Sequence, residues 1–179
     1  YINEIGKKER FVVNLSTSQA LEKLAHKNGS TVERSAVGEI NVVNKMNEVN
    51  SNLGGEGNGG VILKECHLGR DSMVGATMVL NRMSQTENTL SEIHRTLPIF
   101  KIVKDKISID TIDSDELIDK VSNLFNDADK NDLDGIKFTW DDKWVHLRRS
   151  NTEPIMRIYA EAPSEDQALE LVSKIRSII

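Results

Sequence analysis

The residues best suited to chemistry in this sequence form a run of hydrogen-bond donors near its C-terminal end. The run reads Arg148-Arg149-Ser150-Asn151-Thr152-Glu153-Pro154, and Arg157 follows it. A phosphate dianion needs several donors that converge on a small volume. Arginine supplies them in a planar fork, and hydroxyl groups can fill the remaining oxygens. Asn151 tolerates the left-handed backbone of a concave anion-binding turn. The run therefore predicts a phosphate-binding loop.

Two other interpretations of this run compete with phosphate binding. Ser150 and Glu153 have the spacing of a helix capping box. However, Pro154 follows directly, and residues 155–160 alternate apolar and polar side chains, which is typical of a strand. The arginines could also be a solvated pair at a strand end, because charged residues are common on protein surfaces. The strand pattern disfavours the capping box, and the solvated pair stays open.

A second informative stretch is rich in glycine. It reads Gly54-Gly55-Glu56-Gly57-Asn58-Gly59-Gly60. The spelling Gly-x-Gly-x-x-Gly suggests a dinucleotide fingerprint, but that fingerprint needs a strand before it and a helix after it. Here polar residues 50–52 precede, and strand-like residues 61–65 follow. The flanking glycines would let the backbone approach a ligand while Glu56 accepts two sugar hydroxyls. A glycine-rich turn with a solvated glutamate is the alternative.

The elements around this stretch alternate between strands and helices. Residues 11–15 and 31–36 are rich in β-branched side chains and predict strands. The helix between them is expected to start at a Ser16 or Thr17 cap and to end at Gly29. This succession of strand, helix and strand predicts a βαβ unit with parallel pairing, and hence an α/β domain with a mixed sheet.

Two more helices are expected before the middle of the chain. One follows Gly38 and should bury one side, made of Ile40, Val43 and Met46. The next begins near residue 70 with Asp71 or Ser72 as its cap. Its apolar side is expected to pack in the core. That side consists of Met73, Ala76, Val79, Leu80 and Met83.

The second half of the chain has a different order of elements. It predicts a strand over 99–109, a helix capped by Ser114, a hairpin of 136–140 with 144–147, a strand over 155–161 and a helix capped by Ser164 with Gln167. This order predicts a small α+β domain, with an antiparallel sheet packed on two helices. Polar composition and Pro98 place the boundary between domains 1–97 and 98–179.

The composition limits which kinds of partner and compartment we expect for this protein. The net charge of −5 and the lack of a lysine-rich run make nucleic acid an unfavoured partner. No apolar stretch approaches the length of a membrane span, and no signal peptide opens the chain. The single Cys66 indicates a reducing compartment, so we expect a cytoplasmic protein. The four histidines and Cys66 lack the spacing of a metal site. We therefore assign no metal ligand.

Two motifs at matching separation make the sequence similar to the α-D-phosphohexomutases, which include phosphomannomutase, phosphoglucomutase and phosphoglucosamine mutase. Residues 148–154 resemble the loop Arg-x-Ser-(Asn or Gly)-Thr-Glu-Pro of their last domain. Further segments that fall where these enzymes have similar sequences are Val37-Gly38-Glu39, residues 54–60, Gly69-Arg70-Asp71 and Asp134-Gly135. The resemblance implies their third domain without its start, followed by their complete fourth domain. Because the chain opens at Tyr1 within ordinary folded sequence, we expect an excised piece.

The resemblance also implies a function. The full-length enzyme would interconvert hexose 1-phosphate and hexose 6-phosphate through a phosphoserine and a bisphosphate intermediate, with magnesium. In this chain the sugar would be bound by Glu56, Asn58, Gly55 and Gly57. The phosphate that is not reacting would be held by Arg148, Ser150, Asn151, Thr152 and Arg157. The expected partners are a hexose phosphate and the missing N-terminal domains of the same enzyme.

Several departures from the family pattern limit what the resemblance implies. The Ser-His-Asn-Pro nucleophile loop and the Asp-Gly-Asp magnesium loop are absent from the sequence. We therefore assign no catalytic residue and no cofactor to this piece, and expect it to be inactive alone. The usual basic position is Ala36, so no general acid or base is assigned. Asn58 and Gly60 replace the Ser and His of the usual sugar loop. A non-catalytic phosphosugar-binding module and a purely structural domain remain alternatives, and the sugar is not identified.

Overall fold

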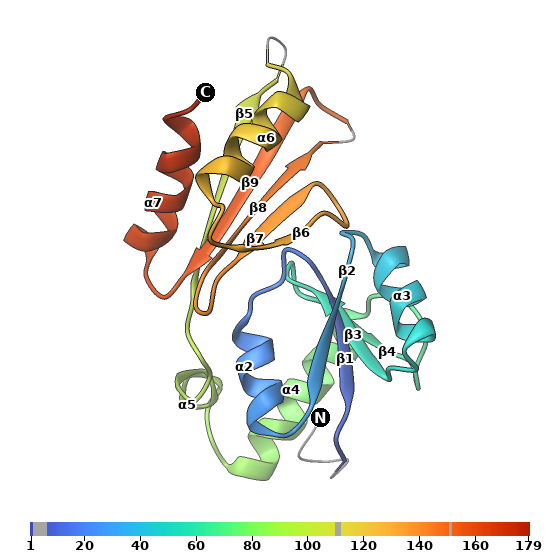
Figure 1. Ribbon diagram of the computed structural model, residues 1–179. Helices are drawn as coiled ribbons and strands as arrows, with labels where there is room; N and C mark the ends of the chain where they lie inside the picture. The colour runs from blue at the N-terminus through green and yellow to red at the C-terminus, as the bar shows by residue number, and fades with distance from the viewer. Residues whose placement is uncertain (2–6, 110–111, 151) are drawn as a thin grey trace. The chain divides into compact units, whose positions relative to one another are not determined.

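The computed structural model describes residues 1, 7–109, 112–150 and 152–179 of the 179-residue chain. It divides into two compact units, residues 1–99 and residues 100–179 (Figure 1). Among the described residues, no helix combines the length and the apolar character that a membrane span requires. Each unit has its own sheet.

Unit 1 confirms the predicted βαβ arrangement. Its elements are β1 (Arg10–Asn14), α2 (Ala20–Lys27), β2 (Thr31–Ser35), α3 (Glu39–Glu48), β3 (Leu53–Glu56), β4 (Gly60–Leu63), α4 (Ser72–Thr86) and α5 (Leu90–Arg95). The sheet has the order β2-β1-β3-β4. Strand β1 is parallel to both β2 and β3, while β3 and β4 form an antiparallel pair. The result is the mixed sheet expected for an α/β domain.

Strand β3 contains the start of the glycine run and was not predicted from the sequence. The sequence predicts no strand there, because glycine is a poor strand former. In the structure Gly54 pairs with Val12 of β1. A Cβ on Gly54 would lie 2.9 Å from the Val12 carbonyl oxygen and would also press on Met46 of α3. Glycine therefore allows this central strand to pack closely under a helix.

Helix α3 and the sheet of unit 1 enclose a small buried cluster. Its buried members are Val12, Val42, Val43, Met46 and Ile62. Helix α3 contributes Val42, Val43 and Met46. Its spacing predicted this for Val43 and Met46. The prediction for Ile40 is wrong, because this side chain is 65% exposed. Ile40 is only the second residue of α3, and Val42 faces the sheet in its place.

Two predictions about helix starts in unit 1 had different outcomes. Asp71 caps α4, as expected, and accepts hydrogen bonds from the N–H groups of Met73 and Val74. Helix α2 begins two or three residues later than predicted, after Gln19 instead of after Ser16 or Thr17, and has no side-chain cap. Thr17 is engaged elsewhere, because its hydroxyl donates to the side chain of Asn14. The polar residues after β1 thus organise a turn instead of starting the helix.

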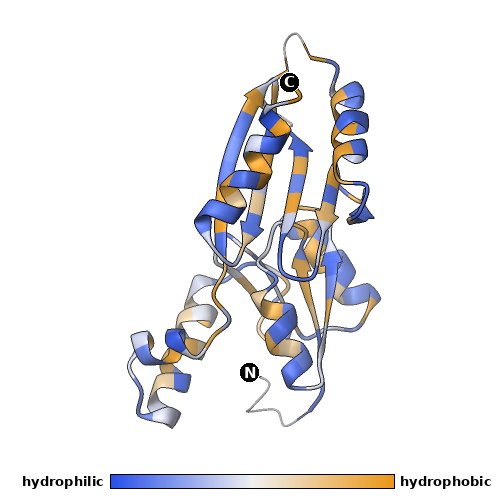
Figure 2. Ribbon diagram, turned by 60° about the vertical axis from the view of Figure 1, so that its left-hand side comes forward, coloured by the Kyte–Doolittle hydropathy of each residue, from blue (hydrophilic) through white to orange (hydrophobic). Residues whose placement is uncertain are grey.

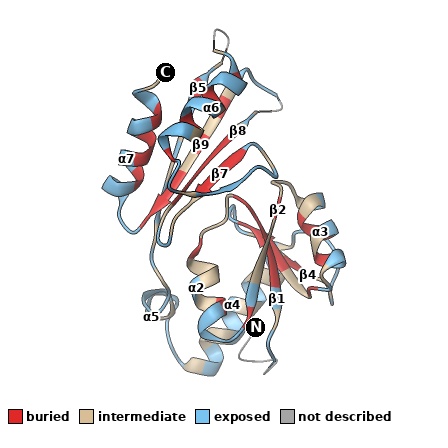
Figure 3. Cartoon of the chain, in the orientation of Figure 1, coloured by how far each residue is buried: buried red, intermediate tan, exposed pale blue. Residues whose placement is uncertain are grey.

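The apolar side of α4 is not buried, contrary to the prediction. Met73, Val79 and Leu80 are 73%, 41% and 63% exposed, and α4 contains no buried residue. Figure 3 accordingly draws this helix in the exposed and intermediate colours. Helix α4 approaches the sheet through Gly75, where a Cβ would lie 3.2 Å from Val61 of β4. Helical periodicity predicted an apolar side but not which side meets the sheet.

Unit 2 confirms the predicted antiparallel α+β domain. Its elements are β5 (Lys101–Ser108), α6 (Ser114–Leu124), β6 (Asp129–Asn131), β7 (Ile136–Thr139), β8 (Trp144–Arg149), β9 (Ile155–Ala162) and α7 (Glu165–Arg176). The strand order is β5-β9-β8-β7-β6, and every pairing is antiparallel. The short edge strand β6 is additional to the predicted order, because its three polar residues carry no strand pattern.

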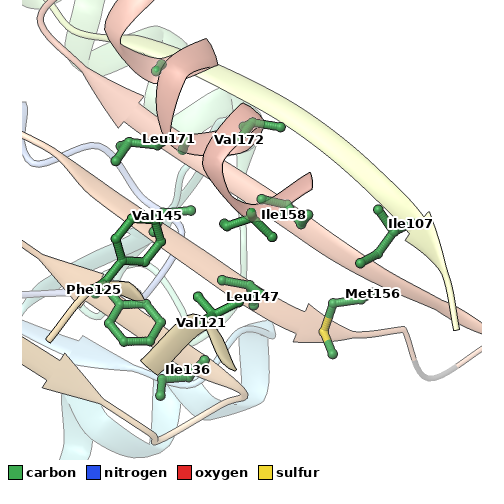
Figure 4. Close-up of a cluster of buried hydrophobic side chains, with 14 of the residues drawn as sticks. Ile107, Val121, Phe125, Ile136, Val145, Leu147, Met156, Ile158, Leu171 and Val172 are labelled. Carbon is green, nitrogen blue, oxygen red and sulfur yellow. The ribbon is translucent and has the colours of Figure 1, made fainter. Parts of the chain in front are cut away.

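The core of unit 2 lies between the sheet and both helices. Alternate residues of the strands meet Leu117 and Val121 of α6 and Leu171 and Ile175 of α7 in one buried cluster (Figure 4). In Figure 2 hydrophobic and hydrophilic residues alternate along the helix that ends at the C-terminus. This amphipathic pattern is what packs the helices on one face of the sheet.

The helix starts of unit 2 were predicted with one error. Ser164 and Gln167 form the expected capping box at α7. At α6 the cap is Asp113 and not Ser114, since the Asp113 carboxylate accepts from the N–H groups of Asp115 and Glu116. Asp and Ser are both good caps, and adjacent candidates cannot be separated by propensity alone.

Candidate functional sites

The glutamate of the glycine run lies at the carboxyl end of the sheet in unit 1. The chain passes from β1 to β2 on one side and then to β3 on the other. In such sheets ligands bind where neighbouring strands diverge in this way, outside their carboxyl ends. Asn14 ends β1 and Glu56 ends β3. Their side chains are joined by a hydrogen bond of 2.8 Å from Asn14 Nδ2 to Glu56 Oε1.

The carboxylate of Glu56 is held by three donors. Besides Asn14, the backbone N–H of Gly38 donates to Oε1 at 3.1 Å. The guanidinium of Arg70 lies 3.2 Å from Oε2. The Glu56 side chain is only 5% exposed. Its carboxylate is therefore fixed in position before any ligand arrives, and it is not the solvated side chain of the alternative interpretation.

Arg70 connects Glu56 to a second carboxylate. Its Nε donates to Glu39 Oε2 at 2.6 Å. This hydrogen bond from Arg70 holds the pKa of Glu39 below its usual range. Arg70 and Glu39 are 42% and 40% exposed, in contrast to the buried Glu56. We call Glu39, Glu56 and Arg70 the strand-end cluster.

The other predicted sugar-binding residues surround Glu56 in the β3–β4 hairpin. Gly55 is buried in β3, where a Cβ would collide with the carbonyl oxygen of Gly60. At Gly57 a Cβ would lie 3.0 Å from Thr17 Cα. Asn58 is exposed in the turn, and its side-chain oxygen accepts from the N–H of Gly60 at 3.2 Å. These contacts explain the hairpin itself, and the roles of Gly55, Gly57 and Asn58 in binding stay predictions.

Three residues of this site were not predicted from the sequence. Asn14, Glu39 and Arg70 lie 42, 17 and 14 positions from Glu56, so only the fold brings them together. A usable signal did exist for Asn14, because it is the one polar residue within the apolar run of the predicted strand 11–15. Glu39 and Arg70 each follow a glycine in a segment of the family resemblance. That resemblance carried no role for either residue.

The predicted phosphate-binding residues lie where β8 turns into β9 in unit 2. Arg148 and Arg157 are directly opposite partners in the β8–β9 register. Opposite residues of two strands point to the same face, where like charges repel each other. The adjacent Arg149 pairs with Met156, a core residue, and so belongs to the other face. Two arginines at opposite positions on one face are an arrangement that an anion would stabilise.

The hydroxyl groups of Ser150 and Thr152 lie near Arg157. Ser150 Oγ lies 3.4 Å from Thr152 Oγ1 and 3.5 Å from a terminal nitrogen of Arg157. The turn is closed by a hydrogen bond of 2.9 Å from Ser150 N to Ile155 O. The structure thus brings Ser150, Thr152 and Arg157 together. Asn151 lies outside the described residues, so its predicted contribution stays a prediction.

Each arginine of this turn also has a carboxylate partner. Arg148 Nε lies 2.9 Å from Asp134, and both side chains are 22% exposed. Arg157 is 3.2 Å from Glu153, and Arg149 is 2.7 Å from Asp115. The last two pairs are more exposed. The exposed pairs are weak and can exchange for an anion. The better buried Asp134 pair instead orients Arg148.

The backbone of Asp134 is held in place by the contacts around it. Its carbonyl oxygen accepts from His146 Nε2 at 2.6 Å. His146 is 2% exposed, and burial lowers the pKa of its imidazole. Gly135 follows with φ of +70°, and a Cβ there would collide with the carbonyl oxygen of Leu147. Only glycine fits this turn without strain, and the turn fixes the carboxylate that pairs with Arg148.

Comparison with known proteins identifies the family. A model described as phosphoglucomutase/phosphomannomutase, alpha/beta/alpha domain III matches residues 1–99. A second model, described as the C-terminal domain of the same proteins, matches residues 103–178. The chain belongs to the phosphoglucomutase/phosphomannomutase family. This confirms the resemblance to the last two domains of the phosphohexomutases.

Individual relatives agree with this assignment. A protein of Thermococcus kodakarensis named phosphoglucomutase/phosphomannomutase is 36% identical over 164 residues, which cover 89% of this chain and 35% of that protein. A family protein from Burkholderia thailandensis has a similar structure, with a TM-score of 0.79, 20% identity, and coverage of 98% of this chain and 38% of that one.

A third relative was solved with ligands. Aspergillus fumigatus N-acetylphosphoglucosamine mutase in complex with GlcNAc-6P and magnesium has a TM-score of 0.64 and 14% identity, covering 93% of this chain and 38% of that one. The chain therefore spans between a third and two fifths of these relatives. Among the described residues, no group of three or more His, Cys, Asp or Glu side chains could hold a metal ion.

Proposed function

We propose that this chain supplies the sugar-binding and phosphate-binding domains of a phosphohexomutase. Unit 1 binds hydroxyl groups of the sugar, and unit 2 binds the phosphate group that is not reacting. The observation that carries this proposal is the pair of directly opposed arginines, Arg148 and Arg157, beside the hydroxyls of Ser150 and Thr152. Two arginines on one face of a sheet repel each other, and a bound anion would offset that repulsion.

The proposed enzyme interconverts hexose 1-phosphate and hexose 6-phosphate through a phosphoserine and a bisphosphate. Phosphoryl transfer depends mainly on positioning and on charge stabilisation, so residues that only bind still contribute to the rate. Arg148 and Arg157 would hold a dianion, and the strand-end cluster would orient the ring. The magnesium implied for the whole enzyme would supply charge stabilisation. The described residues offer it no cluster of ligands, so we assign no step through the metal to this chain.

Titration calorimetry with glucose 1-phosphate and with inorganic phosphate tests the phosphate site. We expect Arg148→Ala to weaken phosphate binding by about 1.5–3 kcal/mol, since charge-assisted hydrogen bonds contribute that much. Arg149→Ala is the matched control, because it removes the neighbouring guanidinium from the other face. It should leave the affinity nearly unchanged.

The result of this pair of variants is decisive for unit 2. Equal affinities of the native and Arg148→Ala chains would contradict the proposed phosphate site, and an equal loss in Arg149→Ala would show a general effect of charge. The whole protein's turnover with mannose, glucose and glucosamine phosphates would then identify the sugar.

A further inference from the structure

A third cation lies in line with the two opposed arginines of unit 2. In the register of the sheet, Lys106 of β5 is directly opposite Arg157 of β9, which is in turn directly opposite Arg148 of β8. Opposite residues of neighbouring strands point to the same face of a sheet. The three side chains therefore form one row across three adjacent strands, on the face that carries the proposed phosphate site.

Charge balance distinguishes Lys106 from the two arginines. Arg148 is paired with Asp134, and Arg157 is paired with Glu153. These two ion pairs together carry no net charge. In the part of the chain that the structure describes, no carboxylate forms an ion pair with Lys106. The uncompensated positive charge of the row is therefore that of Lys106, and such charge is what attracts a dianion.

The neighbouring groups on β5 leave Lys106 available. Asp105, the carboxylate next to it in sequence, belongs to the other face, where Arg176 of α7 donates to it at 2.6 and 2.8 Å. Lys104 lies on the same face as Lys106, but its Nζ is 5.3 Å from the centroid of the Tyr159 ring, which gives it a cation–π contact. Lys106 is exposed and has neither kind of partner among the described residues.

We propose that Lys106 is a further phosphate-binding residue, which supplies the net positive charge that the paired arginines lack. This inference rests on the proposed function and adds a residue of β5 to its phosphate site. Neighbouring strands lie about 4.8 Å apart, so the long side chain of Lys106 can reach an anion bound at Arg157. The guanidinium would hold two phosphate oxygens in its planar fork. The ammonium group would contact another oxygen as a point charge.

A different role is available to a lysine at this position, and the experiment has to separate the two. Strand β5 is an edge strand of its sheet. Lysines on edge strands discourage pairing with a second chain. Lys104 and Lys106 would serve that purpose alike, because they lie on the same face of the same strand. Only phosphate binding predicts that the two lysines differ.

Titration calorimetry of the whole 179-residue chain with inorganic phosphate tests the inference. Lys106→Met should weaken phosphate binding about tenfold, as expected when a charge-assisted hydrogen bond is lost. Lys106→Arg keeps the charge and should bind about as tightly as the native chain. Lys104→Met is the matched control, and it should leave the affinity nearly unchanged. Arg148→Ala, measured beside them, reports on the phosphate site itself.

A second measurement separates contact from a general effect of charge. In NMR spectra of the chain with ¹³C-labelled lysine, the Cε signal of Lys106 can be assigned from its loss in Lys106→Met. That signal should shift when phosphate is added, and the signal of Lys104 should not.

Three results would overturn the inference. Native affinity in Lys106→Met, with or without self-association of the variant, would leave Lys106 only a role at the sheet edge. Equal losses in Lys104→Met and Lys106→Met would show a general effect of charge. In both cases a loss in Arg148→Ala would leave the proposed function standing. If the native chain binds neither inorganic phosphate nor glucose 1-phosphate, the proposed function fails together with the inference.

Discussion

The two candidate sites differ in how their charged groups are held. In unit 1 the Glu56 carboxylate is buried and takes donors from a side-chain amide, a backbone N–H and a guanidinium. In unit 2 Arg148 and Arg157 are opposite each other in β8 and β9, and their carboxylate partners are Asp134 and the more exposed Glu153. The first site is built around a charge that the fold satisfies. The second is built around two like charges on one face of the sheet, each with a carboxylate partner.

This contrast suits the two kinds of ligand that we propose. A neutral hydroxyl binds weakly, so its partners must be oriented in advance and lose little entropy on binding. A phosphate dianion binds strongly enough to replace exposed ion pairs, which contribute little on their own. We therefore expect substitutions in the strand-end cluster to change stability. Substitutions in the proposed phosphate turn, made of Arg148, Ser150, Thr152 and Arg157, should instead change affinity. The following predictions test that division, beginning with the largest expected effect.

Removal of the Glu56 carboxylate should be the most destabilising change at either site. Glu56→Ala leaves the buried amide of Asn14 without its acceptor. An unsatisfied buried donor costs about 1–3 kcal/mol, so the free energy of unfolding should fall by at least this amount. Urea unfolding followed by far-UV circular dichroism measures it. Both tryptophans, Trp140 and Trp144, belong to unit 2, so their fluorescence reports on that unit alone.

The control for this prediction is the exposed carboxylate of the same cluster. Glu39→Ala removes a partner of Arg70 but leaves no buried donor unsatisfied. Its unfolding curve should lie close to that of the native chain. If Glu39→Ala and Glu56→Ala shift unfolding equally, the carboxylate of Glu56 is not the structural centre of the site, and the contrast between the two units disappears.

The sequence predicted features that depend on neighbouring residues and missed those that depend on the fold. The Asp71 cap and the Ser164 capping box were predicted because each signal lies within four residues. Strand β3 was missed because its glycines, which close packing requires, resemble those of a loop. The exposed side of α4 was expected in the core, since periodicity identifies an apolar face and not its partner.

The same division applies to the sites. Arg148, Ser150, Thr152 and Arg157 are close in sequence, and a single turn brings them together, so the motif could be recognised directly. Arg70 and Asn14 reach Glu56 only because β1, β3 and the segment before α4 meet at one end of the sheet. No local pattern contains that information. The ion pair between Arg148 and Asp134 could not be predicted either, although Asp134-Gly135 is part of the resemblance.

The buried histidine of unit 2 should make stability depend on pH. Burial lowers the pKa of His146 in the folded protein, whereas the unfolded chain protonates near the ordinary value of about 6.5. Above that value both states are neutral, and His146 adds no pH dependence. As the pH falls below it, the unfolded state binds the extra proton first. Stability should therefore decrease, by at most about 1.4 kcal/mol for each pH unit.

Tryptophan fluorescence during urea unfolding between pH 7.5 and 5 measures this effect. Carboxylates also titrate in acid, so the contribution of His146 is the difference between the native chain and His146→Gln. The variant should show a shallower decline over the same interval. If stability falls equally with pH in the two proteins, folding does not lower the pKa of His146. That result would contradict the effect expected from its burial.

The smallest stability effect should come from the phosphate turn itself, and its sign is informative. Arg157→Gln removes one of two like charges that face each other across β8 and β9. Such charges repel by about 0.2–1 kcal/mol, and the lost ion pair with Glu153 is exposed and weak. Unfolding at low salt should therefore show stability that is unchanged or higher by up to about 1 kcal/mol, while calorimetry shows weaker phosphate binding. A loss of stability without a loss of affinity would mean that Arg157 serves the fold, and the opposed arginines would no longer indicate an anion site.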